Sequence, residues 1–254
     1  MRNALRGLTG VIAFLLVWEV VGRSGLVPQA FFPPASTVLV RLVEILGQSS
    51  FLLDAIATLL AWAISLGLAV VVAVPLGLLL GSAPAVRLAT GTIVEFLRPI
   101  PSVALIPLAI LVLGTGPASK ISLAVFASVW PILLNAVYAL GELDPQLSDT
   151  ARAYGVRGWR KALRVDLPGA APFIATGVRV AAGIALIVLI STELLSGGSG
   201  GIGYFIHTAS GAENRMDVVL AAVIVAGVLG YLVNAGLEGV RRRWLSWGPQ
   251  EEAT

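Results

Sequence analysis

The sequence predicts an all-α, polytopic membrane protein with about six transmembrane helices. Hydrophobic residues make up 57% of the 254-residue chain and charged residues only 12%, and the mean hydropathy is +0.92. A soluble domain would be about 45–50% apolar and about 25% charged, so a bilayer suits this composition better than water. The length fits one membrane unit of several helices, and we expect a single domain over residues 1–254.

Six apolar stretches follow one another along the chain, and each can span or nearly span a bilayer, which needs about 20 residues. They cover residues 8–21, 55–81, 86–114, 119–140, 173–196 and 217–240. The first has a basic start and lacks a small-x-small cleavage site, which predicts a retained helix that also acts as an uncleaved signal. The third contains Pro99, Pro101 and Pro107 and should break there.

The loop over residues 22–54 should contain an amphipathic helix on the outer surface. Pro33 and Pro34 prevent an earlier helix start, and Ser36 is the expected N-cap. The apolar stripe of this helix consists of Val38, Leu42, Ile45 and Leu46.

A basic, glycine-broken segment over residues 141–172 separates the fourth and fifth stretches. Asp144 followed by Pro145 predicts an N-cap with proline at the first helical position. Gly155 predicts the end of this short helix, with the positive φ that glycine tolerates. One face of the helix is apolar, at Leu147, Ala151 and Tyr154.

A second short helix should follow and end at Pro168, and Pro172 should open the next membrane helix. It has an apolar and a basic face, formed by Trp159, Ala162 and Leu163 and by Arg160, Lys161 and Arg164. The like charges of Arg160 and Arg164, four residues apart, are unfavourable unless an acidic group compensates them. The segment therefore either rests on anionic lipid or docks on a partner, and its defined caps favour a partner.

The distribution of Lys and Arg predicts the orientation of the chain in the membrane. One side carries eleven basic residues, namely Arg2, Arg6, Arg87, Arg152, Arg157, Arg160, Lys161, Arg164, Arg241, Arg242 and Arg243. The other side carries four, namely Arg23, Arg41, Lys120 and Arg215. Both termini and residues 141–172 are therefore expected in the cytoplasm, with residues 22–54 and 197–216 outside.

The basic segment resembles the cytoplasmic EAA loop of the inner-membrane permeases of ABC importers. That motif is Glu-Ala-Ala, three residues, Gly, nine residues and Ile-x-Leu-Pro. Here Asp149, Thr150 and Ala151 stand for Glu-Ala-Ala, Gly155 follows after three residues, and residues 165–168, VDLP, stand for the last four. Asp, Thr and Val depart from the motif letters, so the spacing matches better than the letters do.

The resemblance extends over nearly the whole chain. The stretches FFPPASTVL, FLRPIPSVALIPLAILVLGTGPASKI and STELLSGGSGGIGYFI resemble the branch that handles nitrate, sulfonate, taurine, bicarbonate and some thiamine-precursor substrates. The resemblance implies the type I importer architecture and a permease subunit for a small, anionic solute. An importer of a thiamine precursor or another small organic solute is one alternative. A membrane anchor for a cytoplasmic enzyme, without transport, is another.

In that family the loop forms a coupling helix that docks in a groove of an ATPase subunit. The resemblance thus implies two ATPase copies, a second permease copy in a homodimer, and an extracytoplasmic substrate-binding protein. ATP and Mg would be bound by the ATPases, with no cofactor in this chain, which would lie in the cell membrane. The implied ATPase-coupling residues are Leu147, Asp149, Thr150, Ala151, Arg152, Tyr154, Gly155, Trp159, Leu167 and Pro168.

Polar residues in or near the apolar stretches are candidates for a translocation pathway. They are Glu95, Arg98, Asn135, Arg179, Thr192 and Glu193. All of them except Thr192 have a structural alternative. Glu95 and Arg98 can form a helix-end ion pair, and Asn135 can bond to another helix. Arg179 fits a basic residue at the inner boundary, and Glu193 fits a wetted residue at the outer boundary.

Several kinds of chemistry are excluded or disfavoured. The chain has no cysteine and a single histidine, His207, so disulfides and thiol catalysis are excluded and a histidine-built metal site is not expected. The pattern G-x-x-x-x-G-K-[ST] does not occur, nor do G-x-S-x-G and H-E-x-x-H. We therefore expect no enzyme and no nucleic-acid partner.

Overall fold

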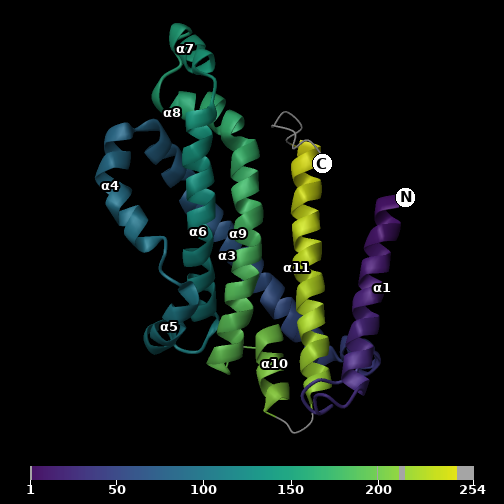
Figure 1. Ribbon diagram of the computed structural model, residues 1–254. Helices are drawn as coiled ribbons and strands as arrows, with labels where there is room; N and C mark the ends of the chain where they lie inside the picture. The colour runs from purple at the N-terminus through teal and green to yellow at the C-terminus, as the bar shows by residue number, and fades with distance from the viewer. Residues whose placement is uncertain (1, 199, 212–214, 245–254) are drawn as a thin grey trace. The chain divides into compact units, whose positions relative to one another are not determined.

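The computed structural model describes residues 2–198, 200–211 and 215–244, and these residues fold into helices and connecting loops (Figure 1). The helices are α1 (Arg2–Arg23), α2 (Ala35–Leu46), α3 (Ser49–Ser82), α4 (Pro84–Leu97), η1 (Ser102–Leu105), α5 (Ile106–Leu113), α6 (Pro117–Glu142), α7 (Pro145–Ala153), α8 (Gly158–Lys161), η2 (Ala162–Asp166), α9 (Leu167–Ser196), α10 (Ile202–Ser210) and α11 (Met216–Trp244). The predicted all-α class is confirmed.

Four helical runs among the described residues are long and apolar enough to cross a membrane. They are α3, α6, the run Gly158–Ser196 and α11. A fifth span results if α4 and Ser102–Leu113, which are bent by 74°, are counted together. The break falls at the prolines that interrupt the third predicted stretch. The first predicted stretch, residues 8–21, lies within α1, which is helical but is not among these spans.

The described chain divides into two compact units. The first contains residues up to Thr58 together with Glu193–Leu229, and the second contains Leu59–Thr192 and the chain from Gly230 onward. The helices α3, α9 and α11 each contribute to both units. That residues 1–254 act as a single permease domain stays a prediction.

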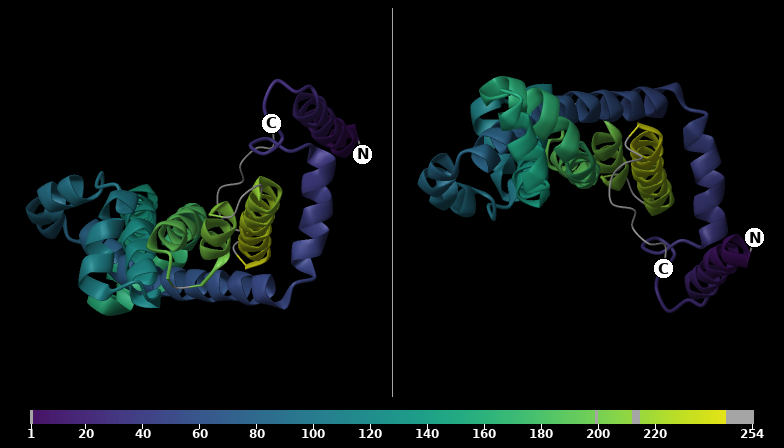
Figure 2. Two further views of the ribbon diagram at one scale, coloured as in Figure 1. Left: turned by 90° about the horizontal axis from the view of Figure 1, so that it is seen from below. Right: turned by 90° about the horizontal axis from the view of Figure 1, so that it is seen from above.

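In the first unit, the core joins α2, α10 and α11 and the start of α3. α10 and α11 lie side by side in both sets of views (Figures 1 and 2). The buried core residues are Val38, Ile45, Phe51, Ile202, Ile206, Val218, Ala221, Ala222 and Val225. The predicted apolar stripe of α2 is thus confirmed at Val38 and Ile45, with Leu42 packed against them, whereas Leu46 is exposed.

The prediction that Ser36 caps α2 is wrong. The N-cap position is Pro34, and Ser36 lies inside the first turn. Its backbone N–H and its hydroxyl each donate to the carboxylate of Glu19 in α1, at 2.9 Å. A carboxylate from another helix therefore accepts a backbone hydrogen bond at the start of α2, where negative charge is favourable.

Farther along α2, hydrogen bonds to the carboxylates of Asp217 and Glu44 raise the pKa of Arg41.

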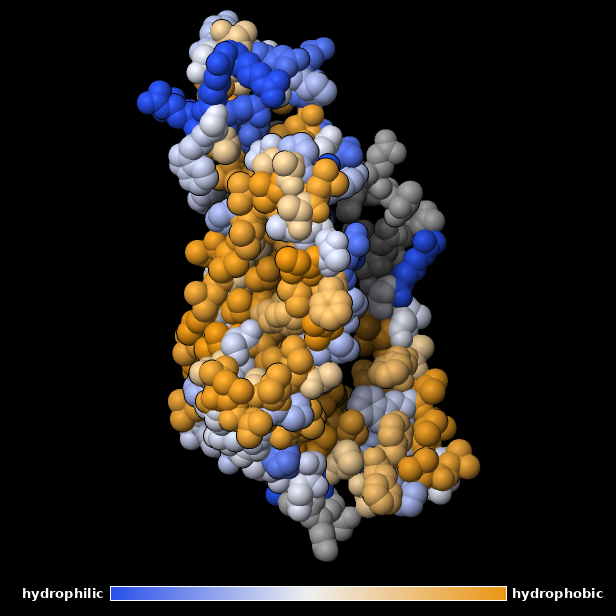
Figure 3. All heavy atoms as spheres, turned by 90° about the vertical axis from the view of Figure 1, so that its left-hand side faces the viewer, coloured by the Kyte–Doolittle hydropathy of each residue, from blue (hydrophilic) through white to orange (hydrophobic). Residues whose placement is uncertain are grey.

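In the second unit, small residues allow α3, α6 and α9 to pack closely, as is common between membrane helices. The buried alanines of these contacts are Ala69, Ala73, Ala136, Ala139, Ala170, Ala181 and Ala182. A Cβ added to Gly177 of α9 would lie 2.8 Å from the carbonyl oxygen of Pro131 in α6. The face of this unit that Figure 3 shows is largely covered by hydrophobic side chains, and hydrophilic side chains gather at the end that carries α7.

The predicted helix stop at Pro168 is wrong, and so is the start of the next helix at Pro172. Residues Gly158–Ser196 form one helical run in which Pro168 lies in the first turn of α9 and Pro172 lies inside it. A π-helical turn, η2, ends at Asp166, directly before α9 and two residues before Pro168. Proline has no backbone N–H and cannot donate the usual hydrogen bond to the residue four positions earlier. A π-helical turn inserts one extra residue, so the helix can continue past such a position.

Candidate functional site

The short helix α7 begins as the sequence predicts. The carboxylate of Asp144 accepts a hydrogen bond of 2.9 Å from the backbone N–H of Gln146, and Pro145 occupies the first turn. This cap satisfies a donor that the helix leaves free at its start. The position at which the chain leaves the long helix α6 and turns into α7 is therefore defined by local chemistry.

The end of α7 is a Schellman motif built on Gly155. Gly155 has φ of +74°. Its N–H donates to the carbonyl of Arg152 at 3.0 Å, and the N–H of Val156 donates to the carbonyl of Ala151 at 2.8 Å. These are the two bonds of the motif, which reverses the chain direction after a helix. The predicted bend at Gly155 with positive φ is confirmed.

The predicted apolar face of α7 does not form one continuous patch. Ala151 is buried, whereas Leu147 is half-exposed and Tyr154 has an exposed fraction of 83%. Asp149 and Thr150 are exposed too. α7 therefore uses Ala151 to pack on its own chain and leaves the other four side chains accessible.

The segment after Gly155 combines an exposed tryptophan with a buried ion pair. Trp159 has an exposed fraction of 66%. The ammonium group of Lys161 donates to the carboxylate of Asp166 at 2.7 Å, and both side chains are largely buried. The two residues are five apart, which matches the i→i+5 geometry of the π-helical turn between them. Sequence reasoning placed Lys161 on an open basic face and gave Asp166 no role of its own.

The remaining coupling-loop residues lie at the rim of this segment. The guanidinium of Arg152 lies 3.6 Å from the carboxylate of Asp149, and both side chains are mostly exposed. Leu167 is half-buried and Pro168 is exposed in the first turn of α9. The structure thus brings the predicted coupling residues together at one hydrophilic end of the second unit (Figure 3).

In the first unit, Glu193 is fully buried. The Thr58 hydroxyl donates to its carboxylate, with oxygen–oxygen distances of 2.9 and 3.0 Å. The backbone N–H of Gly203 also donates to this carboxylate, at 3.1 Å. The alternative of a wetted boundary residue is therefore wrong for Glu193.

Glu193 belongs to a group of three side chains that satisfies the start of α10. The N–H of Gly201 donates to Asp54 at 2.8 Å, the N–H of Ile202 donates to the Thr58 hydroxyl at 3.0 Å, and the next N–H meets Glu193. Three successive backbone donors thus find side-chain acceptors from α3 and α9. Sequence reasoning missed Asp54 and Thr58, for which the only signal is their spacing of four residues on one helix face.

Replacement of Thr58 by valine is expected to lower the free energy of unfolding by about 1–3 kcal/mol. The change leaves the buried N–H of Ile202 without its acceptor and removes one of the donors to the Glu193 carboxylate, which keeps the N–H of Gly203. The measurement is the apparent thermal midpoint of the purified protein in detergent.

The matched control for Thr58 is Thr192→Val. Thr192 is equally buried, but its hydroxyl donates only to the carbonyl of Val188 within the same helix, at 2.7 Å. That carbonyl also accepts a backbone hydrogen bond within the helix, so loss of the threonine hydroxyl should hardly change the free energy of unfolding. Equal losses for the two variants would contradict the capping role of Thr58.

Asn135 bonds within its own helix rather than to another one. Its side-chain amide donates to the carbonyl of Pro131 at 2.8 Å. The Asn135 side chain also borders the contact between α6 and α9 at Gly177. The alternative of an interhelical hydrogen bond for Asn135 is therefore wrong in this structure.

Glu95 and Arg98 line a shallow pocket of about 210 Å³ beside α6, together with Arg87 and Thr90. Both are exposed. No ion pair joins Glu95 to Arg98 among the ion pairs of the described residues. The structure thus brings the two residues to one surface without pairing them.

Arg179 is held by α11 in the second unit. Its guanidinium donates to Asn234 at 2.7 Å and to Glu238 at 3.0 Å. Glu238 also pairs with Arg241 and Arg242. Arg179 therefore already has an anionic partner inside the chain. Among the described residues, no group of three or more His, Asp or Glu side chains could hold a metal ion.

Comparisons with known proteins agree with this architecture. The family model described as the binding-protein-dependent transport system inner membrane component matches residues 73–245. The taurine transport system permease protein TauC of Escherichia coli K12 is 32% identical over 245 residues, which cover 94% of this chain and 88% of TauC. A putative ABC transporter permease protein of Methanocaldococcus jannaschii is 35% identical over 180 residues, 71% of this chain and 67% of that protein.

A further relative is the bicarbonate transport system permease protein CmpB of Synechocystis sp. It is 27% identical over 243 residues, 92% of this chain and 86% of CmpB. Among solved structures, an inward-facing MetNI methionine ABC transporter superposes with a TM-score of 0.65 at 20% identity, covering 76% of this chain and 95% of that one. The family match and the identity with these permeases show that the chain belongs to the binding-protein-dependent inner-membrane transport components, the permeases of ABC importers.

Proposed function

We propose that this chain is the membrane permease of an ATP-driven importer for a small anionic solute. It would work as a homodimer with two ATPase subunits and an extracytoplasmic binding protein. ATP and Mg would be bound by the ATPases. The proposal draws on the family and on relatives whose names refer to taurine and bicarbonate transport.

The observation that carries the coupling part of the proposal is the shape of residues 144–168. Asp144 and Gly155 define both ends of α7, and Leu147, Asp149, Thr150 and Tyr154 remain exposed around it. A loop that only rested on lipid would not need such a defined shape. We infer that these exposed residues meet the ATPase, with Asp149 at a basic or amide group and the two apolar side chains in a groove.

The continuous helical run from Gly158 to Ser196 supplies a route for motion. A helix transmits a push along its axis because successive backbone hydrogen bonds stiffen it, and 39 residues span about 58 Å at about 1.5 Å per residue, although Pro168 and Pro172 donate no bond. α9 packs on α6 at Gly177. ATP-driven displacement of the loop would therefore shift α9 and α6 together as a rigid body, which is the basis of the alternating access that we propose.

Substrate choice would rest mainly with the external binding protein. Arg179, the basic candidate within α9, is already compensated by Glu238. Asn135, Thr192, Glu95, Arg98 and Glu193 stay predicted pathway residues. A thiamine precursor or another small organic solute remains the alternative substrate class.

The test is uptake into proteoliposomes that contain the permease, its co-purifying ATPase and the cognate binding protein. Taurine, an alkyl sulfonate, bicarbonate and nitrate are compared with a cationic thiamine precursor. Stimulation of ATP hydrolysis by one of the anions supports the proposal. If only the cationic thiamine precursor stimulates ATP hydrolysis, the substrate is a cationic organic solute and not a small anion. If no ATPase co-purifies with the chain, a membrane anchor without transport is favoured.

The proposed orientation predicts which side of the membrane each loop faces. The chain has no cysteine, so single cysteines can be labelled with an impermeant maleimide. Tyr154→Cys is expected to react only from the cytoplasmic side and Leu26→Cys only from outside, since both positions are highly exposed. Ala73→Cys, which is buried, is the unreactive control. Labelling of position 154 from outside alone would invert the proposed topology.

A further inference from the structure

A pocket of about 590 Å³ lies between the last turns of α3 and the segment that leads into α9. It falls in the usual volume range of small-molecule sites, about 300–1,000 Å³. All of its lining residues belong to the second unit. The coupling proposal uses Leu147, Asp149, Thr150 and Tyr154, none of which lines this pocket. Arg152 and Trp159, which the family resemblance implies for coupling, do line it, and the proposed function gives them no contact of their own.

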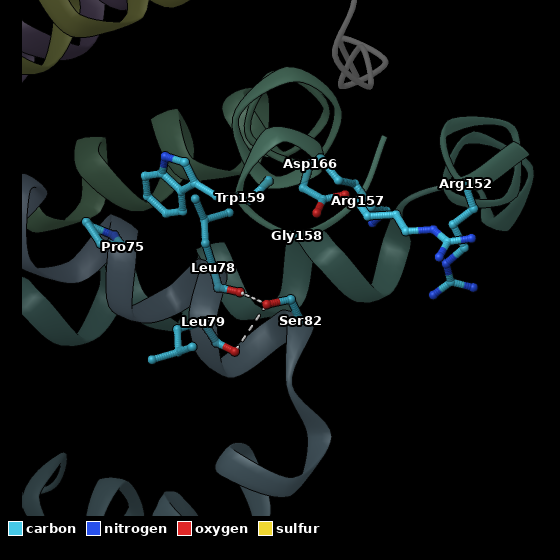
Figure 4. A pocket seen from close by; sticks show the side chains of 11 residues that line it. Pro75, Leu78, Leu79, Ser82, Arg152, Arg157, Gly158, Trp159 and Asp166 are labelled. Atoms are coloured by element: carbon cyan, nitrogen blue, oxygen red, sulfur yellow. Dashed lines mark hydrogen bonds and ion pairs between the residues drawn. The ribbon is translucent and has the colours of Figure 1, made fainter. Parts of the chain in front are cut away.

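The two ends of the pocket differ in chemistry (Figure 4). The indole of Trp159 lies on the side of Pro75 and Leu78, whereas the side chains of Arg152 and Arg157 lie at the opposite end. The pocket therefore has an apolar half and a cationic half, as an amphiphile requires.

The cationic half carries uncompensated positive charge. Lys161 is neutralised by Asp166 at 2.7 Å. The contact of Arg152 with Asp149 is long and exposed, so it is weak. The guanidinium of Arg157 has no ion-pair partner within the described part of the chain. Guanidinium groups favour phosphate because their planar donors match its oxygens in pairs.

The apolar half is the reason to choose a lipid over a soluble anion. Trp159 is mostly exposed, and Leu79, which also lines the pocket, is half-exposed. An inorganic anion would leave this apolar wall in water. Tryptophan is enriched where a membrane meets water, and the pocket lies where the apolar helix α3 ends and the basic segment begins.

We propose that this pocket binds an anionic phospholipid, with its phosphate at Arg152 and Arg157 and the start of an acyl chain on Trp159 and Leu79. The bound lipid would join the end of α3 to the segment that leads into α9. Basic pockets between membrane helices on the cytoplasmic side commonly hold such head groups. The proposal concerns the permease chain alone, so its failure would leave the proposed transport function untouched.

The test is lipid binding to the full-length protein in neutral detergent. Native mass spectrometry follows titrations with phosphatidylglycerol and with phosphatidylcholine of the same acyl chains. The wild type should retain one phosphatidylglycerol in preference to phosphatidylcholine. Arg152→Gln with Arg157→Gln should weaken that binding about thirty-fold, the effect of losing two charged contacts at a membrane surface.

The matched control is Arg160→Gln with Arg164→Gln. It removes the same charge from the same exposed segment at positions outside the pocket, and binding should change by less than about threefold, within one side-chain contact. If the two double variants lose the same amount of phosphatidylglycerol binding, the lipid is held by general attraction to the basic segment and not by the pocket, which would overturn the proposal. Inorganic phosphate should not displace the lipid, and displacement by it would identify a soluble-anion site instead.

A second measurement does not depend on the arginine variants. Phosphatidylglycerol should slow maleimide labelling of Leu79→Cys, which lines the pocket, but not of Leu76→Cys, which is similarly exposed on the same helix outside it. Equal rates with and without lipid would overturn the proposal.

Discussion

Replacement of Gly155 by valine is expected to lower ATP-driven uptake about tenfold or more while the chain stays folded in the membrane. Gly155 has φ of +74°, and its Schellman motif reverses the chain after α7. A β-branched residue is a genuine outlier in this conformation, and the left-handed region costs L-residues about 1–2 kcal/mol. Relief of that strain would redirect α7, so uptake and substrate-stimulated ATP hydrolysis should fall together by about tenfold or more, the equivalent of 1.4 kcal/mol.

The matched control at this position is Gly155→Asn. Asparagine tolerates the left-handed conformation and is the usual second choice after glycine at the end of a helix. No heavy atom beyond the chain neighbours lies within 4 Å of a Cβ added at Gly155, so both variants can place their Cβ freely and differ mainly in their tolerance of the left-handed conformation. The asparagine variant should keep most of the uptake. If valine also keeps uptake and stimulation, the bend is not part of the coupling.

Replacement of Gly201 by alanine is expected to destabilise the first unit more than any other glycine substitution near α10. Gly201 has φ of +119° and ψ of 171°, a conformation that is essentially restricted to glycine. An added Cβ would lie 2.2–2.4 Å from the carboxyl group of Glu193. The carboxylate would have to move, and its bonds to Thr58 and Gly203 would break.

The expected loss is about 3 kcal/mol or more, from backbone strain and from buried donors left without acceptors. At about 2–4 °C per kcal/mol for a chain of this size, the apparent thermal midpoint should fall by about 10 °C. The matched control is Gly197→Ala. Gly197 also has a positive φ, but an added Cβ there lies no closer than 3.6 Å to its neighbour, His207. The control should therefore lose only the backbone part, about 1 kcal/mol.

A double-mutant cycle isolates the contact between the two residues. In a Glu193→Ala background the carboxyl group that collides with residue 201 is absent, so Gly201→Ala should cost clearly less than it does in the wild type. An unchanged cost in both backgrounds would show that strain at Gly201 alone, and not Glu193, governs the effect.

The sequence alone was enough to predict the features that depend on neighbouring residues. The apolar stretches have the length that a bilayer requires, and they recur as α3, α6, α9, α11 and the bent pair α4–α5. Asp144 and Gly155 act within a few residues of their own positions, so the cap and the bend of α7 follow from local backbone chemistry.

The tertiary structure alone decided the features that depend on distant partners. The start of α2 is capped by Glu19 rather than by Ser36, and the start of α10 is capped by Asp54, Thr58 and Glu193, which lie on two other helices. Pro168 does not end a helix, because a π-helical turn and the ion pair of Lys161 with Asp166 carry the chain through it. The physical reason is that buried polar groups must find partners, and the fold determines which side chain is within reach.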